Sequence, residues 1–453
     1  MAGLNCGGVV GPASEAPLRQ HRPCVSAPCD VEDAVSRVHA LSSDQRRAPM
    51  YISIAGPVLT QPLAPFLDHD AARLPEGTGG ASSAVWQLVV ALMEKEQPLS
   101  VVTLDTAVKA PFTARGPLLS VDYRPQRDRH SMRDLLRFER RGVAEGLIRA
   151  QPDLVHAHWC CEYALGAIAT GLPTLVTVHD WMPAVLRLTD LRFWPHWSGR
   201  TLLYFTTLAR ATYLTANSPY TAGKVRRFTR AALEVVPNGV ADGEFRPDIQ
   251  VETAGQRDDN DHVVLSVNNG FSPLKNVRRL LQAFQAVRRK GIDCALHLIG
   301  EGYARGGPCE LWARQERLAD GVAFLGTLSR EEVLARMRRA TVLAHPAREE
   351  AFGMTLVEAM SQRLPDIAGV RSGAVPWVLG GGRAGMLVDV EDAGVLADAI
   401  AAVLLQPERR EGLARQGYEY AWNNYRQSRV ADLYLDVYRR VLVDAAHRGL
   451  TRG

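Results

Sequence analysis

Two glutamates, Glu350 and Glu358, lie eight residues apart in the stretch HPAREEAFGMTLVEAM, residues 345–360. The apolar run before them predicts a strand, and the pattern that starts near Gly353 predicts a helix. Glu350 would then lie just before the helix N-terminus, where free amide groups attract an anion and a glycine permits close backbone approach. Glu358, a little over two turns inside the helix, could reach a polyol beside a bound phosphate. A diphosphate joined to a ribose fits this layout, but acidic helix capping and a surface glutamate fit the residues equally well.

A second stretch, SVNNGFSPLKNVRRLLQAF at residues 266–284, repeats the order of strand, loop and helix. Lys275 would lie at the start of its helix. A cation at a helix N-terminus is unfavourable with the helix dipole unless an anion lies between them. Because the chain contains only five lysines, this position favours an anionic ligand over a solvated lysine at a turn.

Other candidate ligand-binding residues belong to the first half of the chain. Gly79 and Gly80 open a predicted helix in LPEGTGGASSAVWQL, which suits a phosphate or sugar held against backbone amides, although paired glycines are a weak signal. His179, with Asp180 beside it, ends a predicted strand at 173–180, where an imidazole could bind a substrate hydroxyl or phosphate. His156 and His158 share one face of a neighbouring strand; packing is favoured over metal binding because no third ligand can be placed.

Two series of alternating strands and helices must position these residues. The first runs from residue 51 to a strand at 233–240, and the second starts at residue 262 after a polar segment without periodicity. Such alternation predicts parallel sheets with right-handed crossovers. The predicted fold class is therefore α/β, with two Rossmann-like doubly wound domains facing across a cleft, and ligands bind at the carboxyl ends of such strands.

The same patterns suggest four segments. Residues 1–48, rich in Gly, Pro, Ser and Ala, are expected to be a flexible extension. The expected boundaries then give a first Rossmann-like domain at 49–238, a second at 239–425, and a final helix at 426–453.

Composition limits the class of protein. A net charge of +4 over 453 residues does not favour nucleic acid as a partner, and 46% apolar residues are typical of a globular protein. The seven cysteines are scattered, which indicates a reducing compartment. No apolar run reaches the ~18–20 residues of a membrane span, and the N-terminus has no secretory pattern. We expect a cytoplasmic protein, with peripheral contact at the inner face of the cell membrane as an addition.

Taken together, the ordered motifs resemble family 4 of the retaining GT-B glycosyltransferases. The resemblance covers residues 50 to 440 and is strongest in the second half, where the pattern E-x7-E occurs as EAFGMTLVE, Glu350 to Glu358. The blocks ANSPYTAGKVRRF, VVPNGV, LIGEGY, VAFLGTLSREEVLARMRRATVLAHPA and AGMLVDVEDAGVLADAI follow the family's order.

The resemblance implies transfer of a sugar from a nucleotide sugar, with a UDP-sugar favoured and a GDP-sugar second, to a saccharide, lipid-linked or small-molecule acceptor. It implies retention of configuration, no cofactor and no metal ion. On the same resemblance, residues 49–238 would form the N-terminal acceptor-side domain and residues 239–425 the C-terminal nucleotide-sugar-binding domain. The final helix at 426–453 would cross back to the N-terminal domain. The implied catalytic residues are His179, Glu350 and Lys275, with Lys275 on the diphosphate and Glu350 on the transferred sugar. The implied donor-binding residues are Gly79, Gly80, Asn269, Phe352, Gly353, Met354, Thr355 and Glu358, the last on the ribose.

The sequence departs from the family at three places. The usual arginine before the lysine is absent: Asn268 and Asn269 occupy that region, so Arg278 or another arginine would have to supply the charge. Trp377 stands where a glutamate is usual, and Arg363 and Asp366 stand where small or apolar residues are commoner. A nucleotide-sugar epimerase, a sugar phosphorylase and a catalytically silent sugar-nucleotide-binding partner therefore remain alternatives.

Overall fold

The computed structural model describes residues 50–68, 74–75, 83–128, 131–188, 193–246 and 262–449. The predicted extension 1–48 and the predicted phosphate-binding glycines, Gly79 and Gly80, lie outside these ranges.

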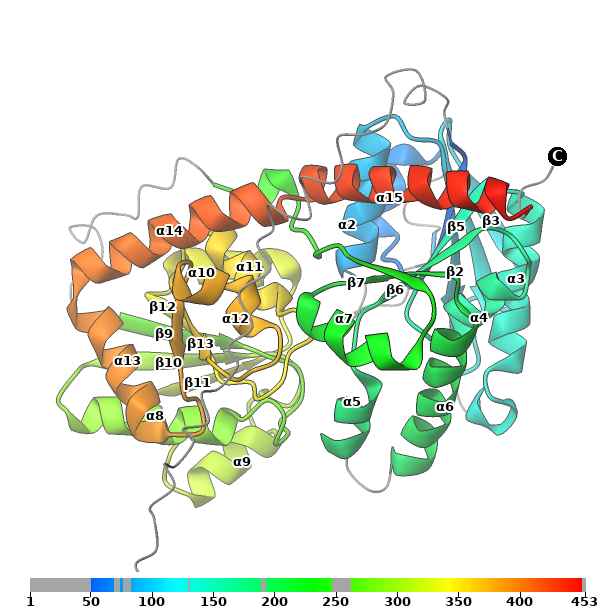
Figure 1. The fold of residues 1–453 in the computed structure, drawn as a ribbon. Coiled ribbons are helices and arrows are strands. Elements are labelled where there is room, and N and C mark those ends of the chain that lie inside the picture. The colour runs from blue at the N-terminus through cyan, green and yellow to red at the C-terminus, as the bar shows by residue number, and fades with distance from the viewer. Residues whose placement is uncertain are drawn as a thin grey trace, which may run out of the picture. The chain divides into compact units, whose positions relative to one another are not determined.

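The first sheet has the strand order β3-β4-β2-β1-β5-β6-β7-β8 (Figure 1). Neighbouring strands are parallel except for the antiparallel pair β3 and β4. The strands are β1 Ile52–Ala55, β2 Leu99–Asp105, β3 Phe112–Arg115, β4 Leu119–Pro125, β5 Leu154–His158, β6 Thr174–Val178, β7 Tyr213–Ala216 and β8 Ala232–Val235. The accompanying helices are η2 Gln61–Phe66, α2 Ser83–Glu94, η4 Ser131–Asp134, α3 Arg137–Ala150, α4 Glu162–Ile168, α5 Met182–Leu188, α6 Trp194–Arg210, α7 Pro219–Val225 and η6 Arg226–Phe228.

The second sheet is parallel throughout, in the order β11-β10-β9-β12-β13-β14. Its strands are β9 His262–Val267, β10 Cys294–Ile299, β11 Val322–Gly326, β12 Val342–His345, β13 Asp366–Gly369 and β14 Met386–Val388. Its helices are η7 Asp242–Glu244, α8 Val277–Arg289, α9 Pro308–Gln315, α10 Arg330–Arg339, α11 Met354–Ser361, α12 Val375–Val378, η8 Gly380–Gly382, α13 Ala393–Leu405 and α14 Pro407–Tyr425.

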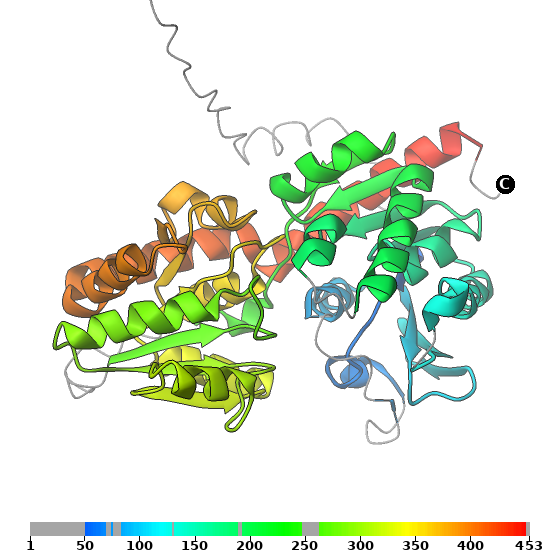
Figure 2. The same ribbon diagram turned by 90° about the horizontal axis from the view of Figure 1, so that it is seen from below.

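Both faces of each sheet are buried under helices (Figure 1 and Figure 2). Successive side chains of a strand point to opposite faces, so Ile54 joins the apolar cluster under α2, whereas Ala55 joins the one under α3 and α4. In the second sheet Val264 packs with α8 and α13, and Leu265 packs with α10 and α11. Burial on both faces explains why the strands read as continuous apolar runs.

The last helix, α15 Gln427–His447, packs on the first sheet's side of the molecule. Tyr438 Oη lies 2.7 Å from His156 Nδ1, Tyr213 donates a hydrogen bond of 2.6 Å to Asp444, and Lys95 lies 2.8 Å from Asp432. No helix within the described ranges is long and apolar enough to cross a bilayer.

The predicted α/β class with two doubly wound sheets is confirmed. The sequence analysis missed β3, β4 and β7, since the four-residue strands β3 and β7 carry little periodic signal. The position of Glu358 was also predicted wrongly. The helix α11 starts at Met354, after Gly353 with a φ of 97°, and Glu358 is therefore in its second turn rather than beyond it.

Candidate active site

Two neighbouring strands of the second sheet bring the site together. β9 and β12 are adjacent and parallel, so the loops after Val267 and after His345 leave the same edge of the sheet. Arg348 N donates a 2.9 Å hydrogen bond to Leu274 O, which ties the two loops together. Lys275 Nζ, carried by the first loop, lies 2.6 Å from Glu350 Oε1, carried by the second.

Asn276 locks this arrangement, and the sequence analysis missed it. Its buried side-chain amide donates to Pro346 O at 3.1 Å and to Val390 O at 2.9 Å. Its φ of 54° is left-handed, which asparagine tolerates better than most residues. The sequence did contain a signal for it: Asn276 directly follows Lys275, the lysine predicted to bind an anion, at the start of a predicted helix.

Glu350 remains a carboxylate in this setting. Burial raises the pKa of Glu350. The Lys275 ammonium and the His345 ring, whose Nε2 lies 3.2 Å from Glu350 Oε1, together lower it by more than burial raises it. The pKa of Glu350 therefore lies below its usual value. Both partners of the ion pair are largely shielded, with side-chain exposures of 19% for Lys275 and 17% for Glu350. An anionic ligand that reached Lys275 would therefore compete with Glu350 for its ammonium group.

Glu358 is also paired. It is buried in α11, and its Oε1 lies 2.7 Å from Arg330 Nη1 at the start of α10. Arg330 also binds Glu244 through two hydrogen bonds of 2.8 and 2.6 Å. Arg330 was missed from sequence, because nothing local marks a helix-start arginine as the partner of a glutamate 28 residues later.

The residues between the two glutamates have different environments. Phe352 is 2% exposed, and its ring packs 5.6 Å from Tyr425 and 6.3 Å from Trp377, so its side chain belongs to the core. Only its backbone is left for a ligand. Trp377, which stands where the family has a glutamate, completes this aromatic cluster. Gly353 caps α11, and the half-buried residues Met354 and Thr355 form its first turn.

Asn269, in the loop after β9, and Arg278, in the first turn of α8, have other partners. Asn269 Oδ1 accepts a hydrogen bond of 3.3 Å from Glu301 N, at the end of β10. The guanidinium of Arg278, one candidate to replace the family's arginine, lies 5.1 Å from the Phe271 ring and 4.9 Å from the Trp312 ring. The structure therefore places Arg278 on aromatic rings rather than in an ion pair with Glu350.

His179 follows β6 in the first sheet and is held from three sides. Its Nε2 lies 2.9 Å from His158 Nδ1, its carbonyl accepts from Asn217 Nδ2 at 2.9 Å, and its ring stacks 4.3 Å from Trp159. Burial lowers the pKa of His179 to about 3, so the imidazole is neutral near pH 7. His158, interpreted from sequence as packing, thus orients a candidate catalytic residue.

Asp180 connects the first sheet to the Lys275–Glu350 pair. Its carboxylate accepts from Trp159 Nε1 at 3.2 Å. Burial raises its pKa, as does the negative charge of Glu350, while Trp159 and Lys275 act in the opposite direction. The end of β6 is therefore within electrostatic range of the loops that carry Lys275 and Glu350. The sequence analysis noted Asp180 beside His179 but gave it no role.

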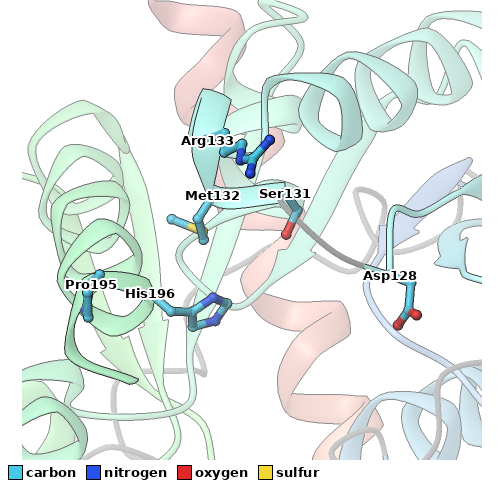
Figure 3. Close-up of a pocket in the computed structure, with 6 residues that line it drawn as sticks. All are labelled: Asp128, Ser131, Met132, Arg133, Pro195 and His196. Atoms are coloured by element: carbon cyan, nitrogen blue, oxygen red, sulfur yellow. The ribbon is translucent and has the colours of Figure 1, made fainter. Parts of the chain in front are cut away.

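Two further features bear on ligands. Within the described ranges, no three His, Cys, Asp or Glu side chains are grouped so that they could hold a metal ion. An open pocket of about 420 Å³ lies between η4 and α6 and contains none of the predicted site residues (Figure 3). It is lined by Asp128, Ser131, Met132, Arg133, Pro195 and His196.

Comparison with known proteins identifies the family. The model of Glycosyltransferase Family 4 matches residues 78–243, and that of Glycosyl transferases group 1 matches residues 250–420. A D-inositol 3-phosphate glycosyltransferase of Saccharomonospora viridis is 29% identical over 66% of this chain and 72% of its own. A GDP-mannose-dependent alpha-(1-6)-phosphatidylinositol monomannoside mannosyltransferase of Mycolicibacterium smegmatis is 30% identical over 45% of this chain and 56% of its own.

The fold is shared with a solved structure, the sucrose-phosphate synthase of Thermosynechococcus elongatus. It aligns with a TM-score of 0.66 at 19% identity, over 87% of this chain and all of that one. With both halves matched in order and the two sheets in place, the chain belongs to the group 1 glycosyltransferases of GT-B fold, enzymes that transfer a sugar from a nucleotide sugar.

Proposed function

We propose that this enzyme transfers a sugar with retention of its anomeric configuration and without a metal ion. The donor is a UDP-sugar or, as second candidate, a GDP-sugar. The acceptor is a hydroxyl of a saccharide, glycolipid or small molecule. The observation that carries the proposal is the ion pair of Lys275 and Glu350 at 2.6 Å, at the carboxyl ends of β9 and β12.

Charge accounting supports a diphosphate at Lys275. Cleavage of a sugar–phosphate bond builds negative charge on the leaving diphosphate, and a fixed cation with aligned amide groups stabilises that charge as it develops. Lys275 supplies the cation, and the first turn of α11, starting at Met354, supplies the amides. No divalent ion is needed in this account.

The existing ion pairs indicate how the donor enters. When the diphosphate binds Lys275, the ion pair between Lys275 and Glu350 weakens. The Glu350 carboxylate can then accept hydrogen bonds from the transferred sugar. Glu358 can likewise accept from the ribose hydroxyls, because Arg330 keeps two hydrogen bonds to Glu244. The neutral His179 ring then faces the sugar or the acceptor. In this account, contacts with the donor replace the ion pairs of Glu350 and Glu358, so neither carboxylate is left without a partner.

The names of the relatives suggest which acceptors should be tested first. Their names refer to an inositol phosphate and a phosphatidylinositol mannoside, which supports a polyol or glycolipid hydroxyl as acceptor. With a lipid-linked acceptor, we further propose that the enzyme is cytoplasmic and makes peripheral contact with the inner face of the cell membrane. Transfer is favoured over the epimerase, phosphorylase and silent-partner alternatives, because these relatives are glycosyltransferases.

A panel of donors tests the proposal. The purified chain is heated with UDP-glucose, GDP-mannose, ADP-glucose and dTDP-glucose, each with and without EDTA. One nucleotide class should raise the melting temperature, since a ligand at 100 times its Kd adds about 2.7 kcal/mol of stability. With that donor and inositol-containing acceptors, NMR of the product should show the donor's anomeric configuration.

Each other outcome contradicts a named part of the proposal. Inversion of the anomeric centre would overturn retention, and loss of turnover in EDTA that Mg²⁺ restores would overturn the metal-free account. Conversion of the donor to an epimer without any acceptor would favour the epimerase. Binding without turnover over a broad acceptor panel would favour the silent partner.

A further inference from the structure

The loop that carries Glu350 is held by side chains from the other half of the chain. Ser218 Oγ donates a 2.6 Å hydrogen bond to Ala351 O, and Thr221 Oγ1 donates a weaker one, 3.4 Å, to the same carbonyl. The Tyr220 hydroxyl donates to the Glu349 carboxylate. Three residues of one short segment thus bind the residues on either side of Glu350. We call Ser218, Tyr220 and Thr221 the clasp.

The start of α7 explains why the clasp can reach the loop. β7 ends at Ala216, and Ser218 is the N-cap of α7, with extended backbone and Pro219 at the first helical position. Its fully buried hydroxyl accepts from Thr221 N at 3.2 Å while it donates to Ala351 O. One hydroxyl therefore caps a helix and binds the Glu350 loop at the same time.

The residue before the clasp binds the other half of the site. Asn217 Nδ2 donates to His179 O, so two consecutive residues hold His179 and Ala351. Asp180 directly follows His179 in the chain, and Glu350 directly precedes Ala351. On the far side, Ala374 N donates a 2.8 Å hydrogen bond to Glu350 O. The Glu350 loop is consequently fixed from the first half and from the second.

We propose that Ser218, Tyr220 and Thr221 are positioning residues for the transfer reaction. They hold the segment from Glu349 to Ala351 beside the segment that carries His179 and Asp180, so that Glu350 and these two residues share one active site. This inference rests on the proposed role of Glu350 at the transferred sugar. On this inference the clasp affects binding of the transferred sugar through Glu350. It does not affect binding of the nucleotide, because Lys275 and Glu358, the proposed contacts of the diphosphate and the ribose, both belong to the second half of the chain.

Single-hydroxyl variants test the clasp. We would compare Ser218→Ala, Ser218→Thr and Tyr220→Phe with Thr206→Val, a control whose hydroxyl donates to Leu202 O within α6. Hydrogen exchange of residues 348–353, measured without ligand, should speed up in Ser218→Ala and Tyr220→Phe and stay unchanged in the control. Ser218→Thr keeps both the cap and the donor and should restore slow exchange.

Kinetics separate positioning from folding. With UDP-glucose or GDP-mannose as donor, kcat should fall about tenfold or more in Ser218→Ala, because small misplacements of reacting groups are costly. Affinity for UDP or GDP by calorimetry should stay within about twofold, as both nucleotide-side contacts remain, and Ser218→Thr should recover most of kcat.

The outcomes that overturn the inference are distinct from those that overturn the function. Unchanged exchange and unchanged kcat in Ser218→Ala and Tyr220→Phe would refute the clasp. A joint loss of melting temperature, nucleotide affinity and kcat would show that Ser218 is only a helix cap. If Glu350→Gln turns over at the wild-type rate, the proposed role of Glu350 fails, whatever the clasp variants do.

Discussion

Glu350 illustrates how single residues of this enzyme are prepared for a ligand. Its carboxylate is shared between the Lys275 ammonium at 2.6 Å and the His345 ring at 3.2 Å. Glu358 is shared with Arg330 in the same way. A buried charge is costly without a partner, and both acids are paired in this structure. On the proposed function, the donor would replace part of this pairing when it binds.

The charge of Lys275 should matter far more than that of a surface lysine. Lys275→Gln should lower kcat about 10²–10³-fold, the usual cost of removing one group that stabilises developing negative charge. Lys290→Gln is the matched control, because Lys290 pairs with Asp398 in the same half of the chain at 47% and 73% exposure. Steady-state kinetics with the donor found by the panel measure both. Equal activity of the two variants would show that Lys275 does not hold the diphosphate.

At the scale of the element, strand β13 contains a buried acidic residue, Asp366, whose carboxyl group forms no stabilising hydrogen bond with the described residues. Asp366 is fully buried at the start of this strand, and neither carboxylate oxygen has a hydrogen-bond partner among the described residues. Burial raises the pKa of the Asp366 carboxyl well above its usual range. It lies at the amino end of the strand, whereas the site is at the carboxyl ends, so its cost falls on stability alone.

Removing this carboxyl should stabilise the protein. Asp366→Ala should raise the free energy of unfolding at pH 7 by about 1–3 kcal/mol, because a buried polar group without partners is lost. The unfolded chain releases the Asp366 proton above about pH 4 while the folded chain keeps it, so the gain should shrink as the pH falls to 4.

Urea denaturation at the two pH values measures the gain. Asp293→Ala, whose side chain is 83% exposed, should change stability by less than about 0.5 kcal/mol. Destabilisation by Asp366→Ala at pH 7 would mean that the carboxyl has a partner after all.

At the scale of the molecule, α15 closes a buried polar network in the first sheet. His156 is bonded to Tyr438 of α15 and to Thr177 of β6, and Tyr434 packs 4.7 Å from its ring. His158, on the same strand β5 as His156, lies 2.9 Å from the ring of His179, which follows β6. Burial lowers the pKa of His156 and of His179 to about 3, and lowers that of His158 as well.

These neutral histidines should make the folded state acid-sensitive. Below about pH 6.5 they bind protons only when the chain unfolds, so the unfolded state gains protons and the free energy of unfolding falls with the pH. Each contributes at most about 1.4 kcal/mol per pH unit. Replacing His179 by asparagine should therefore reduce the loss of stability between pH 7 and pH 5 by about 1–2 kcal/mol.

Urea denaturation at both pH values checks this expectation. His447→Asn is the control, since His447 is exposed in the last turn of α15. A His179→Asn variant whose stability falls with pH as steeply as that of the wild type would contradict a neutral His179.

The spacing of the chemically active residues was readable in advance where the signal was local. Lys275, Glu350 and Glu358 each precede or enter a helix after an apolar strand, and a helix N-terminus attracts the same ligands in any fold. The predicted start of α11 near Gly353 agrees with its observed start at Met354, and only the turn that carries Glu358 was misjudged. Phe352 shows the limit of such reasoning, since its burial against Trp377 and Tyr425 depends on segments 25 and more residues away.

By itself the sequence determined the α/β class, the two doubly wound sheets and the helix ends beside which Lys275 and Glu350 lie, because periodicity and helix ends are short-range properties. Only the tertiary structure decided the partners. The adjacency of β9 and β12 set Lys275 against Glu350 across 75 residues of chain. Packing of α10 beside α11 set Arg330 against Glu358, and a contact between the two halves of the chain set Ser218 against Ala351 across 133 residues. These pairs depend on which strands, helices and loops lie side by side, and that is decided by the packing of both faces of each sheet rather than by any local pattern.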